Sequence, residues 1–213
     1  MSAFKNADGK RIVLAMVREV QNNREYLGQI DGLIGDGDHG MNMNKGFSMC
    51  EKSIADRDLS FSECLDQLGN ILLTEIGGSM GPIYGTIFMD MAGSAQDEID
   101  GKVFLRMLNA GRDGLYEIID ARTGDKTLVD VLAPACDSFE NAINNGDDFA
   151  QALTKMKQTA EAGKESTREL IAKFGRSSRL GERSRGVLDA GATSCNIILQ
   201  AMADEILTLL SKQ

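Results

Sequence analysis

Apolar residues recur at the helical period along almost the whole chain, whereas the strict alternation typical of a β-strand is nearly absent. This pattern predicts an all-α protein built from amphipathic helices. Two shorter helices are expected, one after Asn42 and one from Pro82 through Met91, because proline at the first helical position suits its missing N–H. The longer helices are expected where apolar stripes begin, at Val13, Phe61, Phe104, Val129, Phe149 and Ile197.

The regularity of these rows indicates how the helices are arranged. About eight helices joined by short connections favour an up-and-down bundle or closed barrel of antiparallel helices, with functional groups on the loops at one end. Ser60 and Glu63 predict a capping box before one helix, and Pro134 is expected to kink another about one turn before itself. Because 213 residues without a repeat or linker suit one core, residues 1–213 are expected to form a single domain.

Charge and cysteine content exclude several kinds of partner. The net charge is −9 and no basic tract offsets it, which argues against nucleic acid or an anionic membrane surface. The four cysteines include no C-x-x-C pair, so they are expected to be reduced core residues. With neither an apolar signal region nor a run of about 18 apolar residues, the chain is expected to be cytoplasmic.

The segment from Asp31 to Asn42 combines acidic residues with glycines and the chain's single histidine, His39. Carboxylate oxygens are the ligands that Mg²⁺ prefers, usually together with phosphate oxygens of a substrate. We expect an extended loop in which Asp36 and Asp38 project to one side and form a metal site with Asp31. A solvated acidic loop is the alternative. A calcium-binding EF-hand is excluded, because Met41 and Phe47 replace the Gly and Glu that this motif needs.

Three further segments place glycines and polar residues directly before a helix. The segment from Gly77 to Pro82 could bind an anion through free N–H groups, or form a plain turn. In Gly124–Thr127, Lys126 could supply charge and Thr127 a cap, although an ordinary helix start explains both. The segment from Gly175 to Ser194 holds four arginines, which suit phosphate but also surface salt bridges. We expect the segments to form one site, without a Walker, Rossmann or protein-kinase motif.

Taken in order, the four segments resemble a known family. Asp-x-x-Ile-Gly-Asp-x-Asp-His-Gly-x-Asn, Gly-Gly-x-x-Gly-Pro, Gly-Asp-Lys-Thr and Gly-Arg-x-Ser-x-Leu-Gly-Glu-Arg-Ser, followed by Asp-x-Gly-Ala-Thr-Ser, resemble the nucleotide-binding L subunit of bacterial dihydroxyacetone kinases. The resemblance covers nearly the whole chain. It implies a barrel of eight antiparallel helices that binds ADP or ATP at one end through two Mg²⁺ ions.

The resemblance also implies a role for individual residues. The metal ligands would be Asp31, Asp36 and Asp38, and these three with Arg176 would carry phosphoryl transfer. The nucleotide would be contacted by His39, Gly40, Met41, Asn42, Ser79, Met80, Leu128, Arg176, Asp189, Ala190 and Gly191. The chain departs from the family pattern at Ala190, where proline is usual, at Val187, where histidine is common, and at Ile119, where glycine can line the adenine.

The partners implied are those of a phosphotransferase assembled from several chains. A K subunit would hold dihydroxyacetone covalently through its own histidine, and an M subunit of a sugar phosphotransferase system would rephosphorylate the bound ADP. A transcription regulator and a second copy of the chain are further candidate partners. Two alternatives stay open: a kinase subunit for another small ketose or polyol, and a nucleotide-sensing module. A magnesium-dependent phosphohydrolase is disfavoured, because no nucleophile accompanies the carboxylates.

Overall fold

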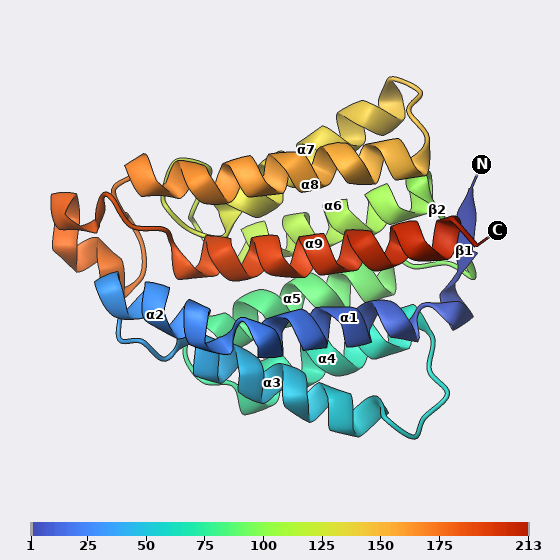
Figure 1. Cartoon of the computed structure of the whole chain (residues 1–213), viewed down its shortest axis with the longest axis horizontal. Coiled ribbons are helices and arrows are strands. Elements are labelled where there is room, and N and C mark those ends of the chain that lie inside the picture. The colour runs from blue at the N-terminus through green and yellow to red at the C-terminus, as the bar shows by residue number, and fades with distance from the viewer. Residues whose placement is uncertain (1, 213) are drawn as a thin grey trace.

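The chain folds into a bundle of helices that lie roughly along one long axis (Figure 1). The computed structural model describes residues 2–212, and helices dominate them, as the apolar periodicity predicted. The α-helices of the described chain are α1 (Lys10–Asn22), α2 (Arg24–Ile34), α3 (His39–Ile54), α4 (Phe61–Glu75), α5 (Met80–Gly93), α6 (Gly101–Ile118), α7 (Val129–Asn144), α8 (Phe149–Ser166) and α9 (Ala190–Leu210). The short 3-10 helices are η1 (Asn6–Asp8), η2 (Thr167–Glu169) and η3 (Arg176–Ser184).

The helices form a closed ring. From α3 to α9 each helix packs against the next in the chain, and α1 closes the ring by contacting both α9 and α3. Successive members of the ring run in opposite directions, as the colour gradient in Figure 1 shows. Asn23 separates α1 from α2, so within residues 2–212 nine α-helices make eight members of the ring. The predicted antiparallel barrel of about eight helices is therefore confirmed.

The barrel is filled by the apolar stripes seen in the sequence. Rings from different helices meet edge to face inside it, including Phe47 with Phe88 and Phe104 with Phe139. Ser60 caps α4 and forms the predicted capping box with Glu63. The four cysteines are buried and unpaired, as expected for core residues. Burial of this apolar surface is the main stabilising contribution to the fold.

Connections alternate between the two ends of the barrel. The α2–α3, α4–α5, α6–α7 and α8–α9 connections gather at the end drawn on the left in Figure 1. The opposite end carries both termini and a small antiparallel sheet, in which β1 (Ala3–Lys5) pairs with β2 (Glu98–Asp100). Within the described chain, none of the helices has the length and apolar character that crossing a membrane requires.

Two helix starts differ from the sequence-based expectation. The α3 helix begins at His39 rather than after Asn42, and α5 begins at Met80, so Pro82 is not its first residue. Proline is still tolerated there, because N–H groups in the first turn of a helix have no intrahelical partner. The α7 helix continues through Pro134, as a helix that is kinked rather than ended by proline would do.

Candidate functional site

The segment from Asp31 to Asn42 is mostly helical, so the prediction of an extended loop was wrong. Asp31 lies in the last turn of α2, and His39 is the first residue of α3. Only the residues from Gly35 to Asp38 connect the two helices. The reason is the buried stripe Leu27, Ile30 and Ile34, which favours continuation of α2 past the first aspartate.

A glycine face on α2 allows the short connection to fold back on the helix. Gly28 and Gly32 lie one turn apart, and a Cβ on Gly37 would be 3.6 Å from the Gly32 Cα. Gly37 itself has φ of +77°, a conformation that other residues adopt at a cost. A Cβ on Gly40 would be 2.0 Å from the carbonyl oxygen of Arg24, so α3 can start here only without a side chain. The close approach returns the connection to the side of α2 that carries Asp31.

The three aspartates converge as a result. One carboxylate oxygen from each of Asp31, Asp36 and Asp38 lies within 4.8 Å of the others. Asp31 also accepts a hydrogen bond from the backbone N–H of His39, at 3.3 Å. Close carboxylate oxygens are a donor set that fits a hard divalent cation such as Mg²⁺. Asp31 lies in the last turn of α2, where the negative end of the helix dipole also favours a cation.

The arginine-rich segment reaches this cluster through η3. The Arg176 guanidinium pairs with the Asp36 carboxylate, with 2.6 Å between Nη1 and Oδ2. A small apolar cluster of Ile30, Leu188 and Ala190 ties α2 to the start of α9 behind this contact. Arg185 instead pairs with the neighbouring Glu182. Part of the arginine content is thus surface pairing, whereas Arg176 belongs to the site.

Lys126 does not face the site, which corrects the idea that it could supply charge there. Its ammonium is buried and donates to the carbonyl oxygens of Thr167 at 2.6 Å, Leu170 at 3.3 Å and Val187 at 2.6 Å. Burial lowers the pKa of this lysine. The residue before α7 is Leu128, and the Thr127 hydroxyl accepts a hydrogen bond from the Val129 N–H at 3.2 Å, so Thr127 does help to cap the helix. Lys126 joins both ends of the α8–α9 connection to the α6–α7 connection.

Asp189 organises the first turn of α9. Its carboxylate accepts from the Ala192 N–H at 2.7 Å, and its own N–H donates to the Thr167 hydroxyl. Burial raises the pKa of the Asp189 carboxyl to about 6, against the opposing effect of the Ala192 N–H and of Lys126. A Cβ on Gly191 would lie 3.6 Å from the Leu128 nitrogen. The starts of α7 and α9, both expected to contact a nucleotide, are therefore neighbours.

His39 is hydrogen-bonded on the side away from solvent. Its Nε2 lies 2.8 Å from the hydroxyl of Ser194, which in turn lies 2.7 Å from the Tyr84 hydroxyl. Burial lowers the pKa of His39, although Asp31 and Asp38 oppose this shift. The contact between Ser194 and Tyr84 was not predicted, because Ser194 stands out in the sequence only as the last residue of the motif Asp-x-Gly-Ala-Thr-Ser and a spacing of 110 residues to Tyr84 carries no signal.

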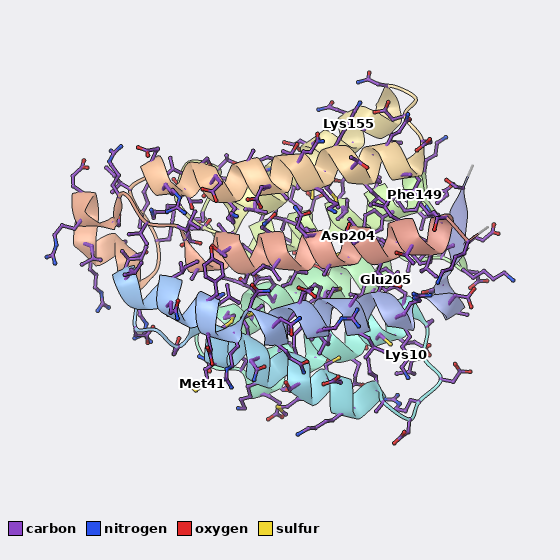
Figure 2. All side chains as sticks on the ribbon, in the orientation of Figure 1. Lys10, Met41, Phe149, Lys155, Asp204 and Glu205 are labelled. Carbon is purple, nitrogen blue, oxygen red and sulfur yellow. The ribbon has the colours of Figure 1, made fainter. Side chains whose placement is uncertain are left out.

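The remaining expected contacts share one location in the fold. Apart from Arg176, they lie at the starts of helices that begin at the site end of the barrel (Figure 1). Ser79 is exposed and makes no cap bond to α5, and Met41 points away from the ribbon (Figure 2). Helix starts present free N–H groups and a positive dipole end, which favour an anion. The contacts are His39–Asn42 on α3, Ser79 and Met80 at α5, Leu128 at α7, and Asp189–Gly191 at α9.

Comparison with known proteins relates the chain to one family. The model of the DAK2 domain matches residues 33–204. A protein of Escherichia coli (strain K12), named PEP-dependent dihydroxyacetone kinase, ADP-binding subunit DhaL, is 39% identical over 184 residues, covering 84% of this chain and 87% of that protein. The ADP-binding subunit DhaL of PEP-dependent dihydroxyacetone kinase 1 from Listeria innocua serovar 6a is 35% identical over 185 residues, covering 86% and 88%.

Solved structures show the same fold. The dihydroxyacetone kinase of C. freundii superposes on 96% of this chain with a TM-score of 0.70 and 22% identity in its native form. Its complex with AMP-PNP and Mg²⁺ superposes with a TM-score of 0.67 and 21% identity. The present chain spans only about a third of those chains, 36% and 35%. At this level of identity the similarity supports the fold alone.

Proposed function

This chain belongs to the DAK2 domain family, and from that premise we propose that it is the ADP-binding subunit of a PEP-dependent dihydroxyacetone kinase. In that role it transfers a phosphoryl group to the hydroxyl of dihydroxyacetone carried by a separate subunit. The observation that carries the proposal is the convergence of Asp31, Asp36 and Asp38 at the end of the barrel where four helix starts gather.

In this proposal the carboxylates bind Mg²⁺ and the helix starts bind the nucleotide. Asp31, Asp36 and Asp38 would hold two Mg²⁺ ions, and bound Mg²⁺ supplies neutralisation of charge on the phosphates. Arg176, which pairs with Asp36, is placed to bind phosphate oxygens through its guanidinium. The starts of α3, α5, α7 and α9 would contact the nucleotide at His39–Asn42, Ser79–Met80, Leu128 and Asp189–Gly191.

Backbone N–H groups explain how a chain with a net charge of −9 could bind a diphosphate. Few cationic side chains are needed where several helix starts converge, because each presents unpaired N–H donors. Ser79 is exposed directly before α5. Gly78, which precedes it with φ of +75°, has no side chain that could block access to the N–H groups of this helix start. The site is therefore suited to phosphate despite the acidic composition.

An apolar rim around the site supports a partner that carries the acceptor. Among the described residues, the exposed large hydrophobic side chains all lie on elements of the site end of the barrel: Tyr26, Leu33, Met41, Leu73, Ile118 and Phe174. Exposed apolar surface concentrated in one place marks an interaction site. We assign the rim to the dihydroxyacetone-bearing K subunit. Rephosphorylation of ADP by an M subunit, and the cytoplasmic location that four unpaired cysteines fit, belong to the same proposal.

Replacement of Asp36 by asparagine tests the metal assignment. Asp36→Asn removes one carboxylate charge without a change in size, so ADP affinity in the presence of Mg²⁺ should fall about 100-fold, or about 2.7 kcal/mol. Isothermal titration calorimetry measures this, with Asp56→Asn, an exposed aspartate in the α3–α4 connection, as the matched control. Unchanged ADP–Mg²⁺ affinity in the Asp36 variant would reject the assignment.

A reconstitution experiment tests the need for a partner. The purified chain with ATP and dihydroxyacetone should turn over negligibly, and addition of the K subunit with a phosphoryl donor should restore transfer. Robust turnover by the chain alone would contradict the proposal. ADP released when the purified protein is denatured would favour rephosphorylation in place over exchange with free ATP.

A further inference from the structure

We propose that Ser194 is a positioning residue, the centre of a buried hydrogen-bond chain that sets the His39 ring and the first turn of α9 relative to the metal carboxylates. The proposal rests on the proposed function, because it concerns the same nucleotide site. Ser194 has no exposed surface, and Tyr84 is 3% exposed. Neither side chain could touch a bound nucleotide, so their effect must pass through other groups.

This chain of hydrogen bonds joins three helices that are far apart in sequence. Ser194 on α9 lies 2.8 Å from the His39 Nε2 of α3 and 2.7 Å from the Tyr84 hydroxyl of α5. The carbonyl oxygen of Gly191 lies 3.1 Å from the Ser194 hydroxyl and 3.2 Å from the Tyr84 hydroxyl. The starts of α3, α5 and α9 are therefore held together at one buried hydroxyl.

Counting protons assigns a direction to each bond. The Gly191 carbonyl can only accept, so the Ser194 O–H is best used to donate to it. The Ser194 oxygen then accepts from the Tyr84 O–H and from a His39 Nε2–H. If Ser194 instead donated to His39, the single Tyr84 proton would have to serve both Ser194 and Gly191. The first arrangement makes more bonds and requires neutral His39 to carry its proton on Nε2.

Both ends of this chain of hydrogen bonds reach groups assigned to the nucleotide site. The backbone N–H of His39 donates to the Asp31 carboxylate, and His39 follows Asp38 directly. At the other end, Gly191 packs next to the Leu128 nitrogen. Loss of the Ser194 hydroxyl would leave the His39 Nε2 without its buried partner, whereas Tyr84 would keep the Gly191 carbonyl, so the His39 ring becomes free to rotate.

The first test is the tautomer of His39 in the unmodified protein. Because His39 is the only histidine in the chain, a long-range ¹H–¹⁵N correlation spectrum reports this ring without ambiguity. In the ADP–Mg²⁺ complex we expect a protonated Nε2 and an unprotonated Nδ1, and a mixture of tautomers in Ser194→Ala. A wild-type ring protonated on Nδ1, or one that averages between tautomers, would overturn the proposal.

The second test compares nucleotide affinity among matched variants. Ser194→Ala and Tyr84→Phe should each weaken ADP binding with Mg²⁺ about tenfold by calorimetry. Ser138→Ala, which removes a hydroxyl paired with Thr159 between α7 and α8, should leave affinity unchanged. If wild-type protein binds no ADP, the proposed function fails. If wild type binds and Ser194→Ala binds equally well, the positioning role fails while the function stands.

Discussion

Two lysines in the same region of the fold, Lys126 and Lys173, illustrate how burial decides the role of a charge. Lys126 is 1% exposed and gives its ammonium protons to backbone carbonyls of the α8–α9 connection. Lys173 is exposed and pairs with Asp125 at 2.6 Å. A buried ammonium that lost its carbonyl partners would be costly, whereas the exposed Lys173 ammonium contributes little and the buried Asp125 carboxylate keeps the Arg122 N–H as a partner. Similar side chains in one region of the fold should therefore differ widely in their effect on stability.

Substitution of these lysines by methionine tests that difference. Lys126→Met removes an ammonium that donates to three carbonyls, of which Thr167 keeps only the Leu170 N–H, and should lower the free energy of unfolding by about 3 kcal/mol. Lys173→Met should lower it by about 1 kcal/mol or less. Urea unfolding followed by far-UV circular dichroism measures both. Equal losses in the two variants would mean that the Lys126 contacts do not hold the connection.

The raised pKa of Asp189 predicts a pH dependence of stability. Its carboxyl has a pKa of about 6 in the folded protein, above the value of about 3.9 expected when unfolded. From about pH 4 to pH 6 the folded state retains a proton that the unfolded chain has released, so this group lowers stability as pH rises and its effect is constant above that window. Below pH 4 both states are protonated and the effect vanishes.

Asp189→Asn removes this titration and can still cap α9. Without ADP or Mg²⁺, the variant should equal wild type in stability near pH 4 and exceed it by about 2 kcal/mol near pH 7. Urea unfolding at a series of pH values gives the difference between the two proteins. Curves that stay parallel from pH 4 to pH 7 would show that Asp189 titrates normally.

At the scale of elements, close backbone contact between α2 and α3 creates the carboxylate cluster. Gly40 meets the Arg24 carbonyl, and Gly28 and Gly32 lie under the connection. The contact shortens that connection to the residues from Gly35 to Asp38 and returns Asp36 beside Asp31. The carboxylate cluster is thus a consequence of how two helices pack, as well as of which residues they carry.

Gly40→Ala should separate these two helices. Its new Cβ would lie 2.0 Å from backbone carbonyl oxygen, which cannot move as a flexible side chain can. The variant should unfold several degrees lower and bind ADP–Mg²⁺ at least tenfold more weakly. Gly93→Ala at the end of α5 meets nothing within 4 Å and serves as control, with stability unchanged or slightly raised. Differential scanning calorimetry measures the unfolding temperatures of both variants, and isothermal titration calorimetry measures their ADP–Mg²⁺ affinities. A Gly40 variant as stable as the control would contradict the packing argument.

At the scale of the whole molecule, the up-and-down topology brings every second connection to one end. Four connections far apart in sequence meet there, with four helix starts and with the exposed apolar side chains of the described chain. The proposed cation site at the end of α2 lies among helix starts suited to anions. The two features together favour a metal-bound diphosphate, and the apolar rim favours a second protein above it.

Two rim residues away from the carboxylates test the docking role. Leu73→Ser and Ile118→Ser remove exposed apolar surface from α4 and α6 without adding charge. Together they should leave ADP–Mg²⁺ affinity unchanged and reduce phosphoryl transfer to the K-bound acceptor at least tenfold at low K concentration. Leu210→Ser, at the far end of α9 where the side chain is partly buried, is the control for loss of an apolar side chain away from the rim. A double variant that transfers like wild type would place the partner elsewhere.

The sequence by itself determined the all-α class and an antiparallel arrangement of about eight helices, and it predicted Asp31, Asp36 and Asp38 as metal ligands, because apolar periodicity and acidic spacing are local signals. It could not determine that Asp31 ends a helix, that Lys126 turns inward, or that Ser194 and Tyr84 meet His39. Those outcomes depend on which helices pack side by side and how closely their backbones approach. Only the closed barrel decides such distances, since residues more than a hundred positions apart meet only when the ring of helices is complete.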